Sequence, residues 1–376
     1  MTPSPVSRLL HRRTGTLAKG EPAVAPPVLS SAFHHPGDPD GSHFYARAGN
    51  PTVEGVEADL ALLEGAPSVL FPSGMAAIAA VMHATLRPGD RVLCHADGYY
   101  NARALLGEHF ARVGVETRHC PTDEMAEADL DDTALVLAET PSNPGLDVCD
   151  LARLAERAKA AGALLVVDNT TATALCQRPL ELGADAVVTA DTKAMAGHSD
   201  VLLGHVATND ASLLDAVRRH RTLGGAIPSP FDAWLLHRGL ETVELRTARQ
   251  NANALAVATA LRGRSADGVP GPTVTGLRYP GLDDDPSHRI AARQMSGFGP
   301  IVSFELADRA TAEAFIDACP LLVSATSFGG THSSAECRTR WGDAVAPGFV
   351  RLACGIEPTA DLVGAVLGAL DGLGGA

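Results

Sequence analysis

Residues 150–193 read DLARLAERAKAAGALLVVDNTTATALCQRPLELGADAVVTADTK, and this stretch decides the fold class. Apolar residues recur at helical spacing over 150–162, whereas 163–167 is a short continuous apolar run of the kind found in buried strands. A second strand pattern follows at 184–189. Strands that alternate with helices of this length indicate right-handed crossover units, so the stretch predicts neighbouring parallel strands.

The same alternation extends toward the N-terminus. Strand patterns lie at 68–71, 91–96 and 134–140, and helix patterns lie between them at 74–86 and 101–114. Together with the stretch above, these patterns predict an α/β fold with a mainly parallel central sheet.

The C-terminal part of the chain has a different pattern. A long helix is predicted over 232–262, and strand patterns follow at 300–306, 320–325 and 348–355, which indicates a smaller α+β unit. One domain seldom exceeds about 300 residues, so we expect more than one. The expected parts are an irregular N-terminal arm, 1–45, a large domain, 46–235, and a C-terminal α+β domain, 236–376. The arm is either a disordered tail or a segment that contacts a neighbouring subunit.

Composition excludes several classes of protein. The 376 residues are 45% apolar, as in globular proteins, and no apolar run approaches the ~20 residues of a membrane-spanning helix. A formal net charge of −14 argues against nucleic-acid binding. The seven Cys are scattered without a C-x-x-C pair, the His form no H-E-x-x-H motif, and the N-terminus lacks a secretory signal. We therefore expect a cytoplasmic protein without disulfides or a metal site.

Residues that follow the predicted strands are the candidates for a site, because ligands of open parallel sheets bind at the carboxyl ends of the strands. These strand ends carry a helix start, an aromatic pair, acids and an amine. The candidates are Ser73, Gly74, Met75, Asp97, Tyr99, Tyr100, Glu139, Asn143, Asp168, Asn169, Thr170, Thr192 and Lys193.

These groups suit pyridoxal 5′-phosphate. Its chemistry needs a Lys that binds its aldehyde covalently, an acid beside its pyridine nitrogen, a phosphate site and a flat surface over the ring. The helix start at 73–75 offers backbone N–H groups to a phosphate. Asp168 follows a buried strand and needs a partner such as the pyridinium N–H, and Tyr99 is a candidate to stack on the ring.

Each of these residues also has an ordinary structural explanation. The Ser-Gly turn at 73–75 is typical of a helix cap, Asp168 of a cap or an ion pair, and Tyr99 of core or surface packing. Other cofactor motifs are absent: no G-x-G-x-x-G follows a strand, and the sequence has no Walker A motif and no G-x-S-x-G motif.

The chain has 27 Arg but only three Lys, so each Lys can be considered separately. Lys159 falls on the polar face of a predicted helix, and Lys19 lies in the N-terminal arm. Lys193 directly follows a buried strand. A loop Lys is commonly a surface residue, but its presence here in so Lys-poor a chain favours a function for Lys193.

Several segments together resemble the Cys/Met-metabolism family of pyridoxal-phosphate enzymes. This family includes cystathionine γ-lyase, cystathionine γ-synthase, cystathionine β-lyase and methionine γ-lyase. The resemblance runs in the family's order from about residue 44 to the last predicted helix. The segments include YARAGNPTVEGVEADLALLEGAPSVLFPSGMAAIAAV (45–81), ETPSNP (139–144), VVDNT (166–170), PLELGADAVVTADTKAMAGHSDVLLGHV (179–206), MSGFG (295–299), TSFGG (326–330) and VRLACGIE (350–357).

The resemblance implies an aspartate aminotransferase-like fold, fold type I, in which 46–235 binds pyridoxal 5′-phosphate. Lys193 would hold the cofactor and move protons at the substrate, Asp168 would pair with the pyridine nitrogen, and Tyr99 would stack on the ring and assist proton transfer. The further residues implied for the cofactor are Ser73, Gly74, Met75, Thr170, Thr192 and, reaching from the neighbouring subunit, Tyr45 and Arg47. The residues implied for the substrate carboxylate are Arg351, Asn143 and Ser327.

Three departures from the family's pattern bear on the substrate. The family often has Ser-Ala-Thr-Lys where residues 190–193 read Ala-Asp-Thr-Lys, so one phosphate hydroxyl is missing. Tyr-Gly-Gly-Thr is replaced by Tyr-Tyr-Asn-Ala at 99–102, and the lack of a Cys after Tyr99 argues against methionine γ-lyase. His332 stands where the family often has a Glu that would meet the distal amine of cystathionine.

The resemblance leads us to expect a cystathionine γ-lyase-like enzyme. It would form cysteine, 2-oxobutyrate and ammonia by γ-elimination, in a homotetramer built from two dimers with shared active sites. Alternatives stay open: γ-replacement that joins cysteine to an O-acyl-homoserine, a methionine γ-lyase or β-lyase activity, transamination, and a non-enzymatic binding role.

Overall fold

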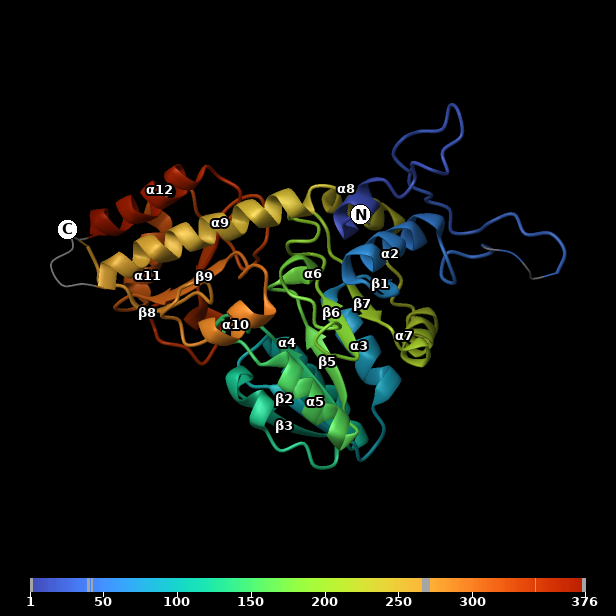
Figure 1. Ribbon diagram of the computed structural model, residues 1–376, viewed down its shortest axis with the longest axis horizontal. Coiled ribbons are helices and arrows are strands. Elements are labelled where there is room, and N and C mark those ends of the chain that lie inside the picture. Colours follow the sequence, from blue (N-terminus) through green and yellow to red (C-terminus); the bar gives the residue numbers. More distant parts are fainter. Residues whose placement is uncertain (1–2, 39–40, 42, 266–270, 342, 374–376) are drawn as a thin grey trace.

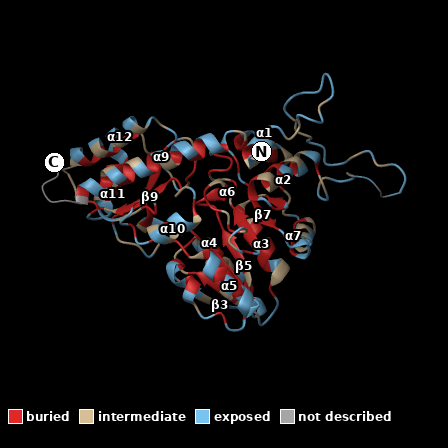
Figure 2. Cartoon of the chain, in the orientation of Figure 1, coloured by how far each residue is buried: buried red, intermediate tan, exposed pale blue. Residues whose placement is uncertain are grey.

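The structure, a computed structural model, describes residues 3–38, 41, 43–265, 271–341 and 343–373 (Figure 1). In that part of the chain, no helix combines the length and the apolar character that crossing a membrane requires. The described residues form a larger sheet and a smaller sheet, each buried under its own helices (Figure 2).

The larger sheet has seven strands. All run parallel except β7, which lies antiparallel between β1 and β6, so the predicted mainly parallel sheet is confirmed. Neither β7 nor β3 was predicted from the sequence. In spatial order the strands are β1 (Ser68–Phe71), β7 (Gly204–Thr208), β6 (Ala186–Thr189), β5 (Leu164–Asp168), β4 (Thr133–Glu139), β2 (Arg91–His95) and β3 (Glu116–Cys120).

Helices cover both faces of this sheet because successive strand residues point to opposite sides and both sides are apolar. Val166 joins the core under α3 and α7, whereas its neighbour Leu165 joins the core under α5. The helices of this part are α1 (Pro5–Leu10), α2 (Pro51–Glu64), α3 (Gly74–Thr85), α4 (Tyr100–Leu105), α5 (Leu151–Ala161), α6 (Thr173–Cys176), α7 (Ala211–Gly224) and α8 (Pro230–Leu240), with short turns η1 (Leu106–Phe110), η2 (Ala111–Val113) and η3 (Thr122–Glu127).

The smaller sheet has five strands and is mostly antiparallel. Its core includes Phe304 and Phe315, whose rings meet edge to face with centroids 5.7 Å apart. In spatial order the strands are β10 (Val323–Ser324), β11 (Ser334–Cys337), β12 (Phe349–Ala353), β9 (Ile301–Glu305) and β8 (Thr275–Arg278). The other elements here are α9 (Val243–Arg262), α10 (His288–Gln294), α11 (Arg309–Ala318), α12 (Thr359–Gly372), η4 (Gly263–Ser265) and η5 (Arg338–Trp341).

The single helix predicted over 232–262 is wrong: the chain forms α8 and α9, with a break after residue 240. Near the break, Gly239 packs so closely that a Cβ would lie 2.4 Å from the carbonyl oxygen of Ala196. Arg246 of α9 donates to the carbonyl oxygens of Gly239 at 2.7 Å and of Ala194 at 2.6 Å. The junction therefore holds the segment that follows Lys193, a tertiary contact that helical periodicity does not reveal.

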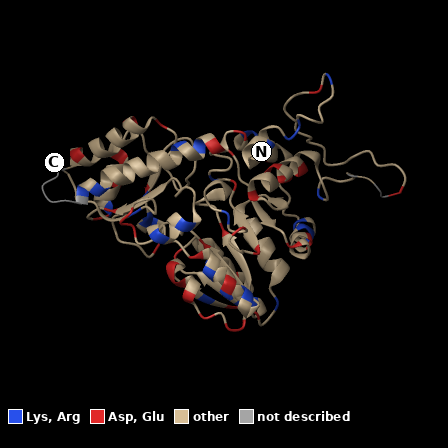
Figure 3. Ribbon diagram, viewed as in Figure 1, with Lys and Arg blue, Asp and Glu red and all other residues tan. Residues whose placement is uncertain are grey.

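The N-terminal segment is only partly irregular. Helix α1 packs on α2 and buries Val6 and Leu9, and the chain then extends away from the body of the molecule (Figure 1). Phe44 and Tyr45, near its end, are exposed. The predicted domain boundaries, after residues 45 and 235, stay predictions. Basic and acidic residues are interspersed along the exposed helices rather than gathered by sign (Figure 3).

Candidate active site

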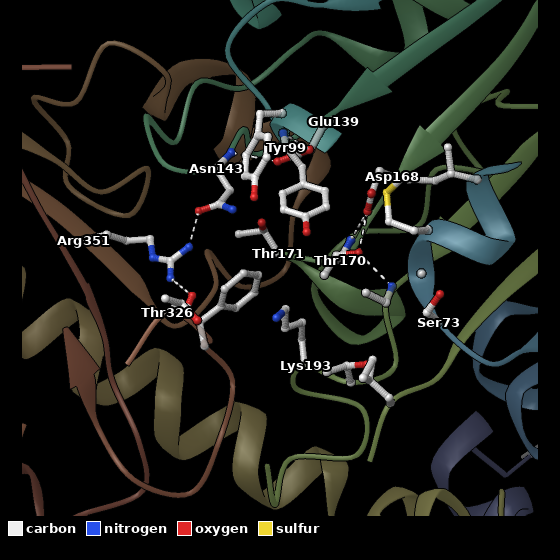
Figure 4. Close-up of a pocket in the computed structure, with 18 of the residues that line it drawn as sticks. Ser73, Tyr99, Glu139, Asn143, Asp168, Thr170, Thr171, Lys193, Thr326 and Arg351 are labelled. Carbon is white, nitrogen blue, oxygen red and sulfur yellow. Dashed lines mark hydrogen bonds between the residues drawn. The ribbon is translucent and has the colours of Figure 1, made fainter. Parts of the chain in front are cut away.

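A cavity of about 380 Å³ lies at the carboxyl ends of the strands of the larger sheet, and residues of the smaller sheet's domain complete its wall (Figure 4). All of the candidate site residues named from the sequence line this cavity except Asp97, Asn169, Tyr45, Arg47 and Ser327. The strand-end rule therefore grouped residues from across 73–193 that share this cavity, and Arg351, which the resemblance implied, lies there with them.

One wall of the cavity is the start of α3. Ser73 is the N-cap, and its hydroxyl accepts a hydrogen bond from the N–H of Ala76 at 3.0 Å. Gly74 packs so tightly on Ala190 that a Cβ at position 74 would lie 2.7 Å from the Ala190 Cβ. Gly74 and Met75 present first-turn N–H groups, which have no partner within their own helix, at the positive end of the helix dipole. This is a suitable place for a phosphate.

Thr192 also lines the cavity, but its hydroxyl is engaged elsewhere. It donates to the carbonyl oxygen of Leu203 at 3.1 Å and accepts from the N–H of Leu203 at 3.1 Å. These two bonds fix the loop that carries Thr192 to the chain that enters β7.

Asp168 ends β5 and is buried. Its Oδ1 accepts hydrogen bonds from the N–H of Thr170, at 3.0 Å, and from the Thr170 hydroxyl. That hydroxyl also accepts from the N–H of Ala190 at 2.8 Å, which ties the ends of β5 and β6 together. Burial raises the pKa of Asp168, and the Thr170 hydrogen bonds and the charge of Lys193 oppose this rise. A buried carboxylate beside a cavity suits a cationic N–H partner.

Lys193 enters the cavity from the loop after β6 and faces Tyr99, with Arg351 on one side and Asp168 on the other (Figure 4). Its Nζ donates to the hydroxyl of Ser327 at 3.0 Å. Burial, followed by the charge of Arg351, lowers the pKa of Lys193 to about 8. An amine with such a pKa has a larger unprotonated fraction near neutral pH than an ordinary Lys, and this neutral form can act as a nucleophile or a base.

Arg351 on β12 faces the same cavity from the other domain. Its Nη1 donates to Asn143 Oδ1 at 2.8 Å, and its Nη2 donates to the carbonyl oxygen of Thr326 and to Glu336. Its Nε is buried and has no hydrogen-bond partner among the described residues. Burial lowers the pKa of Arg351 to about 10, so the group stays cationic at neutral pH. A cation with an unused N–H beside a cavity suits a carboxylate ligand.

Comparison with known proteins agrees with this set of groups. Residues 10–371 match the family model described as Cys/Met metabolism PLP-dependent enzyme. This chain belongs to that family. A Streptomyces coelicolor protein, provisionally named a cystathionine gamma-lyase, is 51% identical over 360 residues, which cover 94% of this chain and 90% of the relative.

Two other relatives show that the names within the family vary, and one of them, CalE6, is described in one solved structure as a cystathionine gamma lyase and in another as a methionine gamma lyase. Cystathionine gamma-synthase of Mycobacterium tuberculosis is 40% identical, with 86% of this chain and 85% of the relative covered. The solved structure of CalE6, a methionine gamma lyase from Micromonospora echinospora, has a TM-score of 0.89 at 38% identity, with 97% of this chain and 98% of that chain covered. Membership therefore establishes a PLP-dependent enzyme of sulfur amino-acid metabolism with the predicted α/β fold, and it leaves the individual reaction open.

Pyridoxal 5′-phosphate is the cofactor of this family, and the residues of the cavity fit it. The start of α3 supplies backbone N–H groups for a phosphate, and the buried Asp168 carboxylate suits a protonated ring nitrogen. Lys193 supplies a buried amine of lowered pKa, the group that binds an aldehyde. Nothing in this set of groups conflicts with the cofactor.

Glu139 belongs to the site, although sequence reasoning gave it no role beyond its place at a strand end. One of its oxygens accepts the N–H of Tyr99 at 2.7 Å and the other accepts the N–H of Asn143 at 2.9 Å. Burial and the neighbouring Asp168 raise the pKa of Glu139 to about 8. One carboxylate thus holds the backbones of two predicted site residues. Its strand-end position, in register with Asp168, was the available signal.

Glu336 was missed entirely. It lies directly opposite Arg351 on the neighbouring strand β11. Its Oε1 accepts from Arg351 and, at 2.7 Å, from Arg338, and its Oε2 accepts from the indole N–H of Trp341 at 2.8 Å. Arg338 and Trp341 also line the cavity. No sequence signal pointed to Glu336, because β11 itself was not predicted.

The remaining predicted residues lie outside the cavity. Tyr45 and Arg47 stand at the end of the N-terminal segment, where the Arg47 guanidinium carbon lies 5.6 Å from the centroid of the Tyr45 ring. Their expected role in a neighbouring subunit stays a prediction. Ser327 contacts Lys193 rather than Arg351. His332 is exposed and is hydrogen-bonded to Thr331.

Proposed function

We propose that this enzyme is a cystathionine γ-lyase, which cleaves cystathionine to cysteine, 2-oxobutyrate and ammonia. The observation that carries the proposal is that Lys193, Asp168 and Arg351 face one cavity in a chain of this family. The choice of cystathionine is supported by the 51% identity to the Streptomyces coelicolor relative, which is higher than the 40% identity to the mycobacterial synthase.

The proposed roles follow from the charge of each residue and from its position in the cavity. Pyridoxal phosphate, when bound, supplies a conjugated ring that accepts negative charge from Cα of an amino acid. Arg351 binds the substrate α-carboxylate, with Asn143 orienting the guanidinium. Asp168 keeps the ring nitrogen protonated through its negative charge, and Tyr99 covers the ring.

Lys193 is the base of the reaction. The substrate amine first takes the place of Lys193 on the cofactor. The neutral Nζ of Lys193 then removes the Cα proton and moves protons at Cβ, so that the γ-thiol can leave as cysteine. Its lowered pKa, about 8, keeps a useful fraction of the amine unprotonated near neutral pH. The Ser327 hydroxyl, 3.0 Å from Nζ, accepts its hydrogen bond and holds the free amine in the cavity.

The proposal includes the assembly. Tyr45 and Arg47 bind the cofactor phosphate of a neighbouring subunit, in a tetramer of two dimers, which gives the exposed segment that carries them a function. A cytoplasmic location is part of the proposal, and it is supported by the seven free Cys. A measured molar mass in solution, together with cofactor loss on Arg47→Ala, tests the assembly.

The second candidate reaction is γ-replacement, which joins cysteine to an O-acyl-homoserine. It is supported by the 40% identity to cystathionine gamma-synthase over most of both chains. Both reactions need the same base and the same carboxylate site, so the described residues favour neither.

A substrate panel separates the candidates. Purified holoenzyme is given cystathionine, homocysteine, methionine, cysteine and O-acyl-homoserines with cysteine, and keto acid, thiol and cystathionine are measured. We expect 2-oxobutyrate and cysteine from cystathionine at the highest kcat/KM. Faster formation of cystathionine from the O-acyl-homoserine would replace the lyase assignment by the synthase. Conversion of the cofactor to its amine form without thiol release would indicate transamination.

A further inference from the structure

A buried polar cluster lies behind the phosphate side of the cavity. It consists of His205 on β7, Asp191 in the loop that leads to Lys193, and Glu64 at the end of α2. His205 Nδ1 lies 2.8 Å from Asp191 Oδ1, and Nε2 lies 3.2 Å from Glu64 Oε1. The His205 and Asp191 side chains are completely buried, and that of Glu64 is 2% exposed.

The contacts define the charge of His205. Each ring nitrogen faces a carboxylate oxygen, and only the imidazolium form donates from both nitrogens. Burial alone lowers the pKa of His205, but Asp191 and then Glu64 raise it to about 10. The other oxygen of Asp191, Oδ2, is buried and has no hydrogen-bond partner among the described residues. His205 faces both carboxylates and offsets one of their two charges, so the cluster keeps one net negative charge.

The cluster adjoins the cofactor site through both of its chain segments. Asp191 lies between Ala190, which packs on Gly74, and Thr192, which lines the cavity. His205 follows Gly204, where a Cβ would lie 2.5 Å from backbone atoms of Gly74. The ion pair between Asp191 and His205 thus joins the two segments that enclose the start of α3.

An acid at position 191 is unfavourable next to a phosphate. A phosphate and an unbalanced buried carboxylate repel each other strongly, because little water lies between them to screen the charges. The imidazolium of His205 offsets one of the two buried carboxylates and so lowers this repulsion.

We propose that His205 is a positioning residue for the cofactor: its imidazolium neutralises Asp191 and so keeps an unbalanced negative charge away from the phosphate site. The charge of His205 then contributes to cofactor binding in this chain, in addition to any bracing of α2, β7 and the Lys193 loop. The inference concerns the family's cofactor and does not depend on which sulfur amino acid is the substrate.

The test separates charge from shape with isosteric variants. Holoenzymes of wild type, His205→Gln, Asp191→Asn and the double variant are dialysed against graded pyridoxal phosphate to obtain its Kd. We expect His205→Gln to raise Kd at least about tenfold, because Asp191 loses its counter-charge. Asp191→Asn and the double variant should stay within about threefold of wild type, because the formal charge of the cluster, −1 in wild type with His205 protonated, becomes 0 and −1 in these variants and reaches −2 only in His205→Gln.

The matched control is Glu64→Gln, which removes the other carboxylate of the same imidazole and leaves the Asp191–His205 pair neutral. Its Kd should also stay within about threefold of wild type. The midpoints of thermal unfolding of the same samples measure separately how far the cluster stabilises the fold. A lowered midpoint with an unchanged Kd in His205→Gln would overturn the proposal. So would a double variant that binds the cofactor as weakly as His205→Gln. If His205→Gln does not fold, Asp191→Asn decides: a Kd raised tenfold or more overturns the proposal, and a Kd near wild type supports it.

Discussion

Replacing Arg351 by Lys tests the carboxylate site directly. The substitution keeps a positive charge but removes the planar guanidinium, which bonds to Asn143, Glu336 and Thr326 and leaves Nε unused. A Lys has a single nitrogen, so it cannot keep these bonds and also bind a carboxylate through two N–H groups. We therefore expect the variant to bind substrate more weakly while its proton chemistry is preserved.

The magnitude follows from the lost hydrogen bonds. A hydrogen bond to a charged group contributes about 1.5–3 kcal/mol, so the loss of one at the substrate carboxylate raises KM roughly 10- to 150-fold. Because Lys193 and Asp168 are unchanged, kcat should fall by less than about fivefold. The assay is the initial rate of 2-oxobutyrate release over a range of cystathionine concentrations, or of the product that the substrate panel identifies.

Arg340→Lys is the matched control. Arg340 lies 3.8 Å from the same Glu336, but it is partly exposed and does not line the cavity. Its KM should equal that of wild type. If Arg351→Lys binds cofactor normally and its KM stays within about threefold of wild type, the substrate carboxylate binds elsewhere and the role given to Arg351 is refuted.

The other predictions concern proton chemistry. Lys193→Ala should lose turnover and the absorbance of covalently held cofactor, whereas Lys159→Ala, on α5, should keep both; retained turnover in the first would exclude Lys193 as the base. Asp168→Asn should bind cofactor but lose about 100-fold or more in kcat, and an unchanged kcat would remove its role. With substrate bound, the single-turnover rate should rise with pH and level off above about 8, because that is the lowered pKa of Lys193 and the unprotonated amine is the base. A rate that is flat between pH 6.5 and 9 would contradict this.

Helices and strands with a clear pattern of apolar residues were predictable from the sequence. The continuous apolar runs ending at Glu139, Asp168 and Thr189 indicated buried parallel strands, and the strand-end rule placed the start of α3, Asp168 and Lys193 at one edge of the sheet. The resemblance then pointed to Arg351 and Asn143, which the structure brings into contact across 208 positions. These site residues were therefore predictable from the local sequence pattern and from the family's motifs.

Only the tertiary structure revealed the partners of these residues. Strand β7 was not recognised, because its sequence, GHVAT, has Gly, His and Thr among its five residues and no clear apolar pattern, and it is this His that meets Asp191 and Glu64. The role of Glu139 and the cluster around Glu336 depend on which oxygen meets which N–H once the two domains have packed. Local sequence determines where strands and helices form and which residues stand at their ends. Hydrogen bonds and ion pairs, in contrast, need atoms within a few ångströms of each other. Only the packing of distant segments brings these atoms together and sets the pKa values of the site.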